Sequence, residues 1–218
     1  MPKLCSFREF LATGKLDELT PEKNLMEVAD LLGTPQYWMD GGHNGPYPLY
    51  WGYTGKHRDN APCIEIAFND IPPHAMSWFQ FEHADCFSDE VHVFGNDIVL
   101  AMDGFTSETR ASELISSGGW DPRLVRVYYN AKIDMLLVTS GQVEVTYMLE
   151  DDESDKLDEA RRTELQEAFG RAALFAEMDA KYLWNSIFSH PAQSREQLLE
   201  RPGMSMCTGE QYLRSLRA

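Results

Sequence analysis

Residues 63–83 read CIEIAFNDIPPHAMSWFQFEH, and their pattern decides the fold of this 218-residue chain. From 63 to 68 an apolar residue stands at every second position, with Glu65 on the opposite side. From 76 to 83 two phenylalanines alternate with Trp78, Gln80 and Glu82. A period of two is typical of a strand that buries one face. The stretch therefore predicts two strands whose polar side carries Glu65, Trp78 and Glu82.

Helices and a further strand are expected around this pair. A short helix is predicted over 6–12 and a longer one over 21–32, with Thr20 as its N-cap and Gly33 just past its end. The apolar run 98–102 predicts a central strand, and 107–116 predicts a helix that ends at two glycines.

A β-hairpin is predicted over 132–149. Two alternating runs, 132–139 and 142–149, flank Ser140-Gly141, which we interpret as a two-residue turn. Glycine suits such a turn because it adopts a positive φ without steric cost.

The pattern becomes helical after residue 150. An acidic run at 150–155 precedes an apolar stripe at helical spacing, and shorter helices are expected near 193–200 and 208–216. The aromatic Trp184 and Phe188 are expected to dock these helices onto the sheet. The sequence thus predicts an α+β fold: a mostly antiparallel β-sheet packed against helices, with a helical C-terminal third. We assign 1–150 to a sheet domain and 151–218 to a helical extension packed on it as one structural unit.

The distribution of charge points to a binding role. The chain has a net charge of -16, and residues 59–109 hold ten carboxylates and no lysine or arginine. Such a surface repels nucleic acid and anionic membranes and attracts basic proteins. We therefore expect a basic protein partner, no nucleic acid and no membrane. The residues expected to bind this partner are Glu65, Trp78, Glu82, Asp85, Asp89 and Glu90.

Cysteine usage and the N-terminus favour the cytoplasm. The four cysteines, at positions 5, 63, 86 and 207, contain no CxxC pair, and the sequence MPKLCSFREF has no signal-peptide core. We expect free thiols in a cytoplasmic protein. No apolar run approaches the ~20 residues that span a bilayer.

The motifs of known enzyme classes are missing from the sequence. It holds no P-loop, GxGxxG, nucleophile elbow or HExxH. We expect no catalytic centre and no cofactor. The alternative is a hydrolase or metal-dependent enzyme built around His83, Cys86 and His92, because HADC has a spacing that zinc sites use. A third option is a scaffold subunit that docks through the C-terminal aromatic helices.

One family resemblance extends over about residues 20–150. The chain has an LLG-x-P turn at 31–35, Trp38 in the following loop, an aromatic YWG strand start at 50–52 and then the 64–68 strand. In this order of elements it resembles bacterial toxin-immunity proteins. The resemblance implies a cytoplasmic, non-catalytic protein that neutralises a cognate toxin by occluding it. It assigns no functional residue, since these proteins share no catalytic motif.

Overall fold

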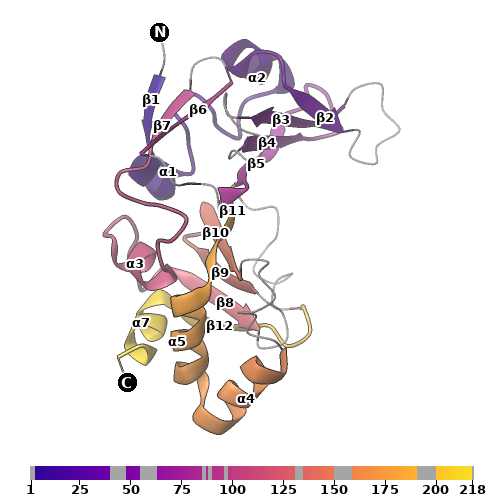
Figure 1. Cartoon of the computed structure of the whole chain (residues 1–218). Helices are drawn as coiled ribbons and strands as arrows, with labels where there is room; N and C mark the ends of the chain where they lie inside the picture. The colour runs from indigo at the N-terminus through magenta and orange to yellow at the C-terminus, as the bar shows by residue number, and fades with distance from the viewer. Residues whose placement is uncertain are drawn as a thin grey trace.

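A computed structural model gives the fold of the chain (Figure 1). The structure describes residues 3–39, 48–54, 63–84, 87, 90–95, 98–130, 135–149, 159–190 and 200–217. The expected acidic run at 150–155, most of the helix near 193–200, and three of the expected site residues (Asp85, Cys86 and Asp89) lie outside these ranges.

A nine-stranded sheet runs through the molecule, in the order β12-β8-β9-β10-β11-β5-β4-β3-β2, with every neighbouring pair antiparallel. Its strands are β2 (Tyr37–Met39), β3 (Tyr50–Thr54), β4 (Cys63–Phe68), β5 (Met76–Glu82), β8 (Arg126–Asn130), β9 (Met135–Thr139), β10 (Val143–Met148), β11 (Leu183–Ser189) and β12 (Ser205–Thr208).

A second, smaller sheet contains β1 (Lys3–Ser6), β7 (Ile98–Ala101) and β6 (Val91–Phe94). Strand β7 lies at its centre, parallel to β1 and antiparallel to β6. The predicted central strand at 98–102 is therefore central, but in the small sheet.

The helices of the described residues are α1 (Phe7–Thr13), α2 (Leu25–Leu32), α3 (Ala111–Ser116), α4 (Glu159–Phe169), α5 (Arg171–Lys181) and α7 (Gly209–Ser215). Figure 1 shows α1, α2 and the small sheet beside β2–β5 at one end of the molecule, and α3, α4, α5 and α7 beside β8, β9 and β12 at the other. None of the described helices has the length and apolar character needed to cross a membrane.

The helices and the large sheet enclose an aromatic core. Near one end, the ring of Phe10 in α1 lies 5.9 Å from that of Phe79 and 5.2 Å from that of Phe81, both in β5. Near the other, Phe175 of α5 meets Tyr129 of β8 edge to face at 4.7 Å. The alternation in β5 therefore buries its phenylalanines as the sequence predicts. We call the opposite face of β2–β5 and β11 the outer face.

Several predicted elements are confirmed. Strands β4 and β5 occupy the predicted stretches, α7 matches the helix expected near 208–216, and α1 follows the N-cap Ser6, whose hydroxyl accepts from the Glu9 N–H at 3.1 Å. The start of α2 differs from the prediction. It lies at Asn24, which forms a capping box with Glu27 and so satisfies the first free N–H groups of the helix better than Thr20 would.

The hairpin is confirmed over 135–148 with its turn moved by one residue, and residues 132–134 lie outside the described ranges. The Ser140 N–H donates to the Val143 carbonyl at 3.0 Å, so the central residues are Gly141 and Gln142. Gly141 has φ of 95°, as a tight turn requires.

The helical C-terminal third is only partly confirmed. The single predicted stripe is two helices, α4 and α5, interrupted at Gly170, whose φ is 80°. Trp184 and Phe188 do not belong to the C-terminal helices: they lie on β11, which pairs with both β10 and β5 inside the sheet. Aromatic and β-branched residues favour strands, and the Asn and Ser residues of this segment disfavour helix. Because Trp184 is 1% exposed, it offers no surface to a partner.

The Gly141 turn can be tested by substitution. No atom lies within 4 Å of a Cβ built on Gly141, so a side chain there is strained only by the positive φ. We expect Gly141→Val to lower the free energy of unfolding by about 1–3 kcal/mol and Gly141→Asn by much less, because asparagine tolerates this region. Urea unfolding at constant m value measures both. Equal losses for Val and Asn would contradict the turn geometry.

Candidate functional site

The outer face carries a network of polar side chains centred on Glu65. The carboxylate of Glu65 in β4 accepts hydrogen bonds from the Tyr37 hydroxyl at 2.6 Å, from the Tyr50 hydroxyl, and from Nε2 of Gln80 at 2.6 Å. The same Gln80 nitrogen donates to Glu82 at 2.9 Å. One amide group thus bridges two carboxylates on neighbouring strands.

Strand register explains why these side chains meet. Tyr37, Gly52, Glu65 and Gln80 stand opposite one another on β2, β3, β4 and β5. A Cβ on Gly52 would lie 1.9 Å from the ring of Tyr37. The tyrosine ring therefore lies over the bare backbone of β3, and its hydroxyl reaches across that strand to Glu65. Only glycine at position 52 permits this reach.

Burial governs the acidity of the network. Glu65 and Gln80 are 8% and 6% exposed. Burial raises the pKa of the hydroxyls of Tyr37 and Tyr50 well above their usual range, and their hydrogen bonds to Glu65 raise it further. Burial also raises the pKa of the Cys63 thiol, next to the Tyr37 hydroxyl, to about 11. Both tyrosines are therefore neutral donors at pH 7, and Cys63 is a thiol rather than a nucleophilic thiolate.

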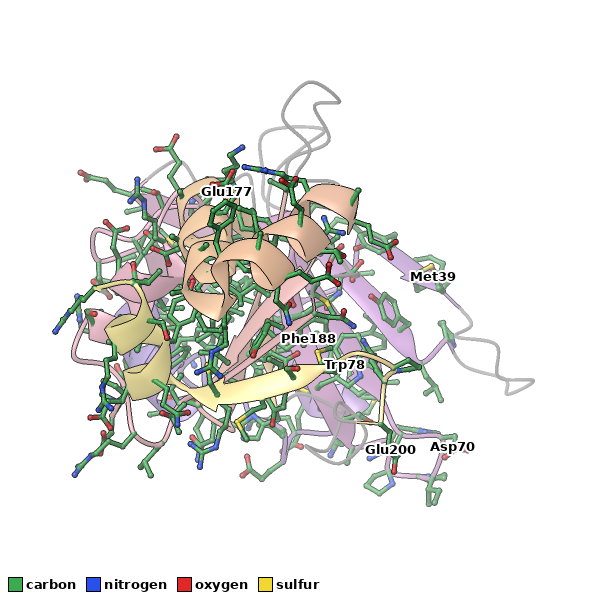
Figure 2. The ribbon with its side chains drawn as sticks, turned by 90° about the horizontal axis from the view of Figure 1, so that it is seen from below. Met39, Asp70, Trp78, Glu177, Phe188 and Glu200 are labelled. Carbon is green, nitrogen blue, oxygen red and sulfur yellow. The ribbon has the colours of Figure 1, made fainter. Side chains whose placement is uncertain are left out.

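A row of aromatic rings borders the network. Trp78 meets Tyr50 edge to face at 5.7 Å on one side and Phe188 at 5.7 Å on the other. Figure 2 shows Trp78 and Phe188 next to each other. All three rings are half-buried, so each keeps a part exposed to solvent. Partly exposed aromatic side chains beside carboxylates are suited to binding cationic groups.

The expected partner-binding residues have different surroundings. Glu65, Trp78 and Glu82 share the outer face, as the alternation predicts. A partner-binding residue should be exposed, but Glu65 is only 8% exposed and its carboxylate already accepts three hydrogen bonds. Glu90 is exposed but immediately precedes β6 of the small sheet. Asp85 and Asp89 lie outside the described residues.

The alternative metal site is not assembled in the part of the chain that the structure describes. His83 is exposed, with φ of 56°, and His92 of β6 is half-buried with its ring 4.7 Å from that of Phe87. The described ranges hold no group of three or more metal-ligating side chains. Cys86 lies outside them, so the three-residue set stays a prediction.

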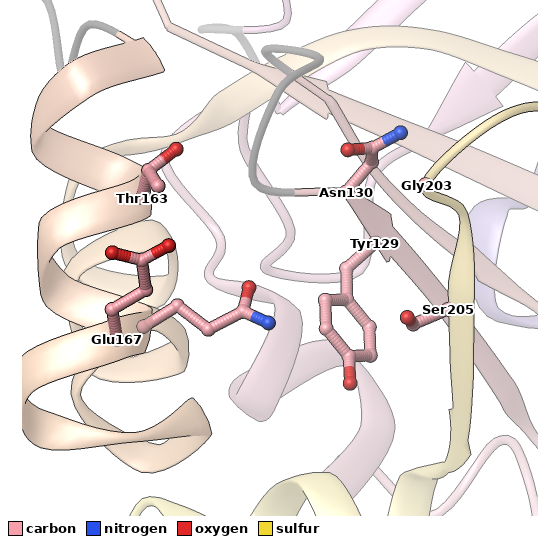
Figure 3. Close-up of a pocket in the computed structure, with 7 residues that line it drawn as sticks. Tyr129, Asn130, Thr163, Glu167, Gly203 and Ser205 are labelled. Carbon is pink, nitrogen blue, oxygen red and sulfur yellow. The ribbon is translucent and has the colours of Figure 1, made fainter.

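Two pockets lie elsewhere, against the helices. One, of about 240 Å³, separates α4 from β8 and β12 and is lined by Tyr129, Asn130, Thr163, Gln166, Glu167, Gly203 and Ser205 (Figure 3). Its described lining has one carboxylate and no histidine, cysteine or lysine to act with it. The other, of about 420 Å³, lies between α3, α5 and α7. Its Asp179 is occupied structurally, since it accepts from Ser112 N, Ser112 Oγ and the Tyr212 hydroxyl at 2.8, 2.7 and 3.1 Å.

Sequence reasoning missed the donors of the network. Period-two alternation places Cys63 and Gln80 on the side of Glu65 and Glu82, so it could have identified them as neighbours. Tyr37 could not be found this way, because it reaches Glu65 across an intervening strand.

Comparisons with known proteins find no counterpart. Protein-family models, curated proteins and solved structures all give no match to this chain. The site has to be interpreted from its geometry and chemistry alone.

The two carboxylates of the Glu65 network are not arranged as an acid–base pair. Both are bonded to one amide nitrogen, which occupies the space between them. A reacting bond therefore has no room between Glu65 and Glu82, as it would need for paired acid–base catalysis. The aromatic rings of Tyr50, Trp78 and Phe188 each keep a part exposed to solvent.

The role of Glu65 as a structural acceptor is testable. Glu65→Lys would bury an ammonium and leave three donors without their acceptor, so we expect a loss of about 3 kcal/mol or more in the free energy of unfolding. Glu177→Lys, half-buried on α5 and outside the network, is the matched control, with an expected loss of about 1 kcal/mol or less. Chemical unfolding compares the two. Equal losses would show that the network does not stabilise the sheet.

A second buried carboxyl on the large sheet predicts a pH dependence. Burial raises the pKa of Glu144 from 4.5 to about 7, and the Arg201 charge partly offsets this. Between these values the folded state binds more protons than the unfolded state, so stability falls as pH rises from 4.5 to 7. We expect Glu144→Gln to remove this fall and to add up to about 3 kcal/mol above pH 7. Urea titrations from pH 4.5 to 8 test this, and parallel pH profiles for the two proteins would contradict it.

Proposed function

We propose that this chain is an acidic binding protein that docks a basic protein partner on its outer face and neutralises it by occlusion, as immunity proteins do. The observation that carries the proposal is the row of half-buried rings formed by Tyr50, Trp78 and Phe188, next to the bridged carboxylates of Glu65 and Glu82. Aromatic anchors surrounded by a polar rim are the usual composition of binding hot spots.

The overall charge supports a basic partner. The chain carries -16, and residues 59–109 contain carboxylates without any compensating lysine or arginine. Long-range attraction of this kind raises the association rate of an oppositely charged protein and is screened by salt. The Glu65 network contributes by fixing Tyr50 and Gln80 in place before the partner arrives, which reduces the entropy cost of binding.

The proposal predicts distinct kinetic effects for two variants. A partner is captured from the native host with the full chain, and its association and dissociation rates are then measured by surface plasmon resonance. We expect Trp78→Ala to raise the dissociation rate about tenfold, because an aromatic anchor is lost. We expect Glu82→Lys to slow association several-fold at low salt and to weaken its salt dependence.

Glu177→Lys is the matched control. It reverses the same charge on α5, away from Trp78 (Figure 2), where Glu177 pairs with Lys181 at 3.1 Å. A partner whose rates respond to Trp78 and Glu82 but only weakly to Glu177 supports the proposal, and loss of the partner's activity in the complex supports occlusion. If both outer-face variants bind as wild type does, this face is not the interface.

A further inference from the structure

We infer that the outer face contains a binding site for a guanidinium group, formed by the side chains of Gln80 and Glu82 and flanked by the rings of Trp78 and Phe188. The inference rests on the proposed function, because the guanidinium would belong to an arginine side chain of the basic partner. It adds the chemistry by which that partner is recognised.

The amide oxygen of Gln80 is the first observation. Gln80 is 6% exposed, its nitrogen donates to Glu65 and Glu82, and its Oε1 is a buried atom without a hydrogen-bond partner. An unsatisfied buried acceptor destabilises the folded state. The two carboxylates fix the direction of the amide, since the reverse orientation would place oxygen against oxygen. The site therefore contains a buried acceptor to which no group in the described part of the protein donates a hydrogen bond.

The surroundings select a cationic N–H donor. Glu65 and Glu82 repel an anion. A metal ion would have to displace the donors that Glu65 already accepts from, which are Tyr37, Tyr50 and Gln80. A ligand with several N–H groups leaves the bonds of Glu65 in place, because it would donate to Gln80 Oε1 and to the Glu82 carboxylate, which can accept several hydrogen bonds at once.

Geometry favours a guanidinium over an ammonium. Its planar fork of five donors can serve a carboxylate and an amide oxygen together, whereas an ammonium is a compact and strongly hydrated charge. Arginine is also the cation found more often against aromatic rings. Trp78 and Phe188, whose ring centroids are 5.7 Å apart, supply such rings on the side of Gln80.

Binding requires a local movement. The Gln80 oxygen is closed to solvent, and Phe188 stands directly opposite Gln80 in the β5–β11 register. A donor therefore reaches the oxygen only when a side chain that covers it moves, and the rings of Phe188 and Trp78 lie next to each other on this face. The resonances of the Trp78 indole and the Gln80 amide should therefore report binding.

The test is an NMR titration of the ¹⁵N-labelled full chain with Nα-acetyl-arginine amide. The Trp78 indole signal is assigned by its loss in Trp78→Phe. We expect the Trp78 indole and Gln80 amide signals to shift with arginine amide and to shift at least several-fold less with Nα-acetyl-lysine amide. Glu82→Gln, which keeps the shape and removes the charge, should weaken the arginine affinity about tenfold. Glu177→Gln on α5 should leave it unchanged.

Each other outcome overturns the inference. Absence of shifts at Trp78 and Gln80, equal affinity in Glu82→Gln, or the same shifts with calcium chloride would each exclude a guanidinium site. The two proposals fail separately. If a captured partner depends on Trp78 while arginine amide is not bound, the docking face stands and the guanidinium site is wrong. If arginine amide binds but no basic partner depends on Trp78, the guanidinium site stands and the docking face is wrong.

Discussion

Strand β11 is the element on which the rest of the structure depends. It lies between β10 and β5 and forms antiparallel ladders with both, so it joins the β8–β10 and β12 part of the sheet to β2–β5. The ring of its Trp184 also packs against the rings of Phe7, Phe87 and Phe105, with centroid distances of 5.3, 6.4 and 6.5 Å. Without β11, two strand edges would expose unpaired backbone groups, and the core would lose its central ring.

The position of β11 between β10 and β5 affects how the chain folds. Strand β5 ends about a hundred residues before β11 begins. Pairing these two strands therefore requires a long stretch of chain to be ordered, which costs entropy. Contacts of such sequence separation slow folding. The same ladder places Phe188 next to Trp78, so the aromatic row of the outer face exists only once the sheet is complete.

The two faces of β4 and β5 show how one sheet serves two purposes. The inner side chains are apolar and pack on α1, where they stabilise the fold. The outer face buries polar groups, which is favourable only because tyrosine and glutamine donors satisfy Glu65. The Gln80 oxygen is the exception on this face, because it is buried without a hydrogen-bond donor among the described residues. A buried polar atom of this kind indicates where a ligand can bind.

Local pattern determined a large part of the fold. Strands β4, β5, β9 and β10, helix α1 and the end of α2 at Gly33 could be predicted, because alternation, caps and turn residues act over a few neighbouring positions. The same alternation placed Glu65, Trp78 and Glu82 on one face. The concentration of negative charge is likewise a property of the sequence alone.

The tertiary structure decided what depends on distant partners. Residues 183–189 form a strand inside the large sheet because β10 and β5 pair with them, and the local sequence does not identify these distant partners. Whether Glu65 faces solvent or a network depends on Tyr37, which reaches it only over Gly52. Burial and hydrogen-bond partners are set by packing between segments that are distant in the sequence, so only the tertiary structure determines them.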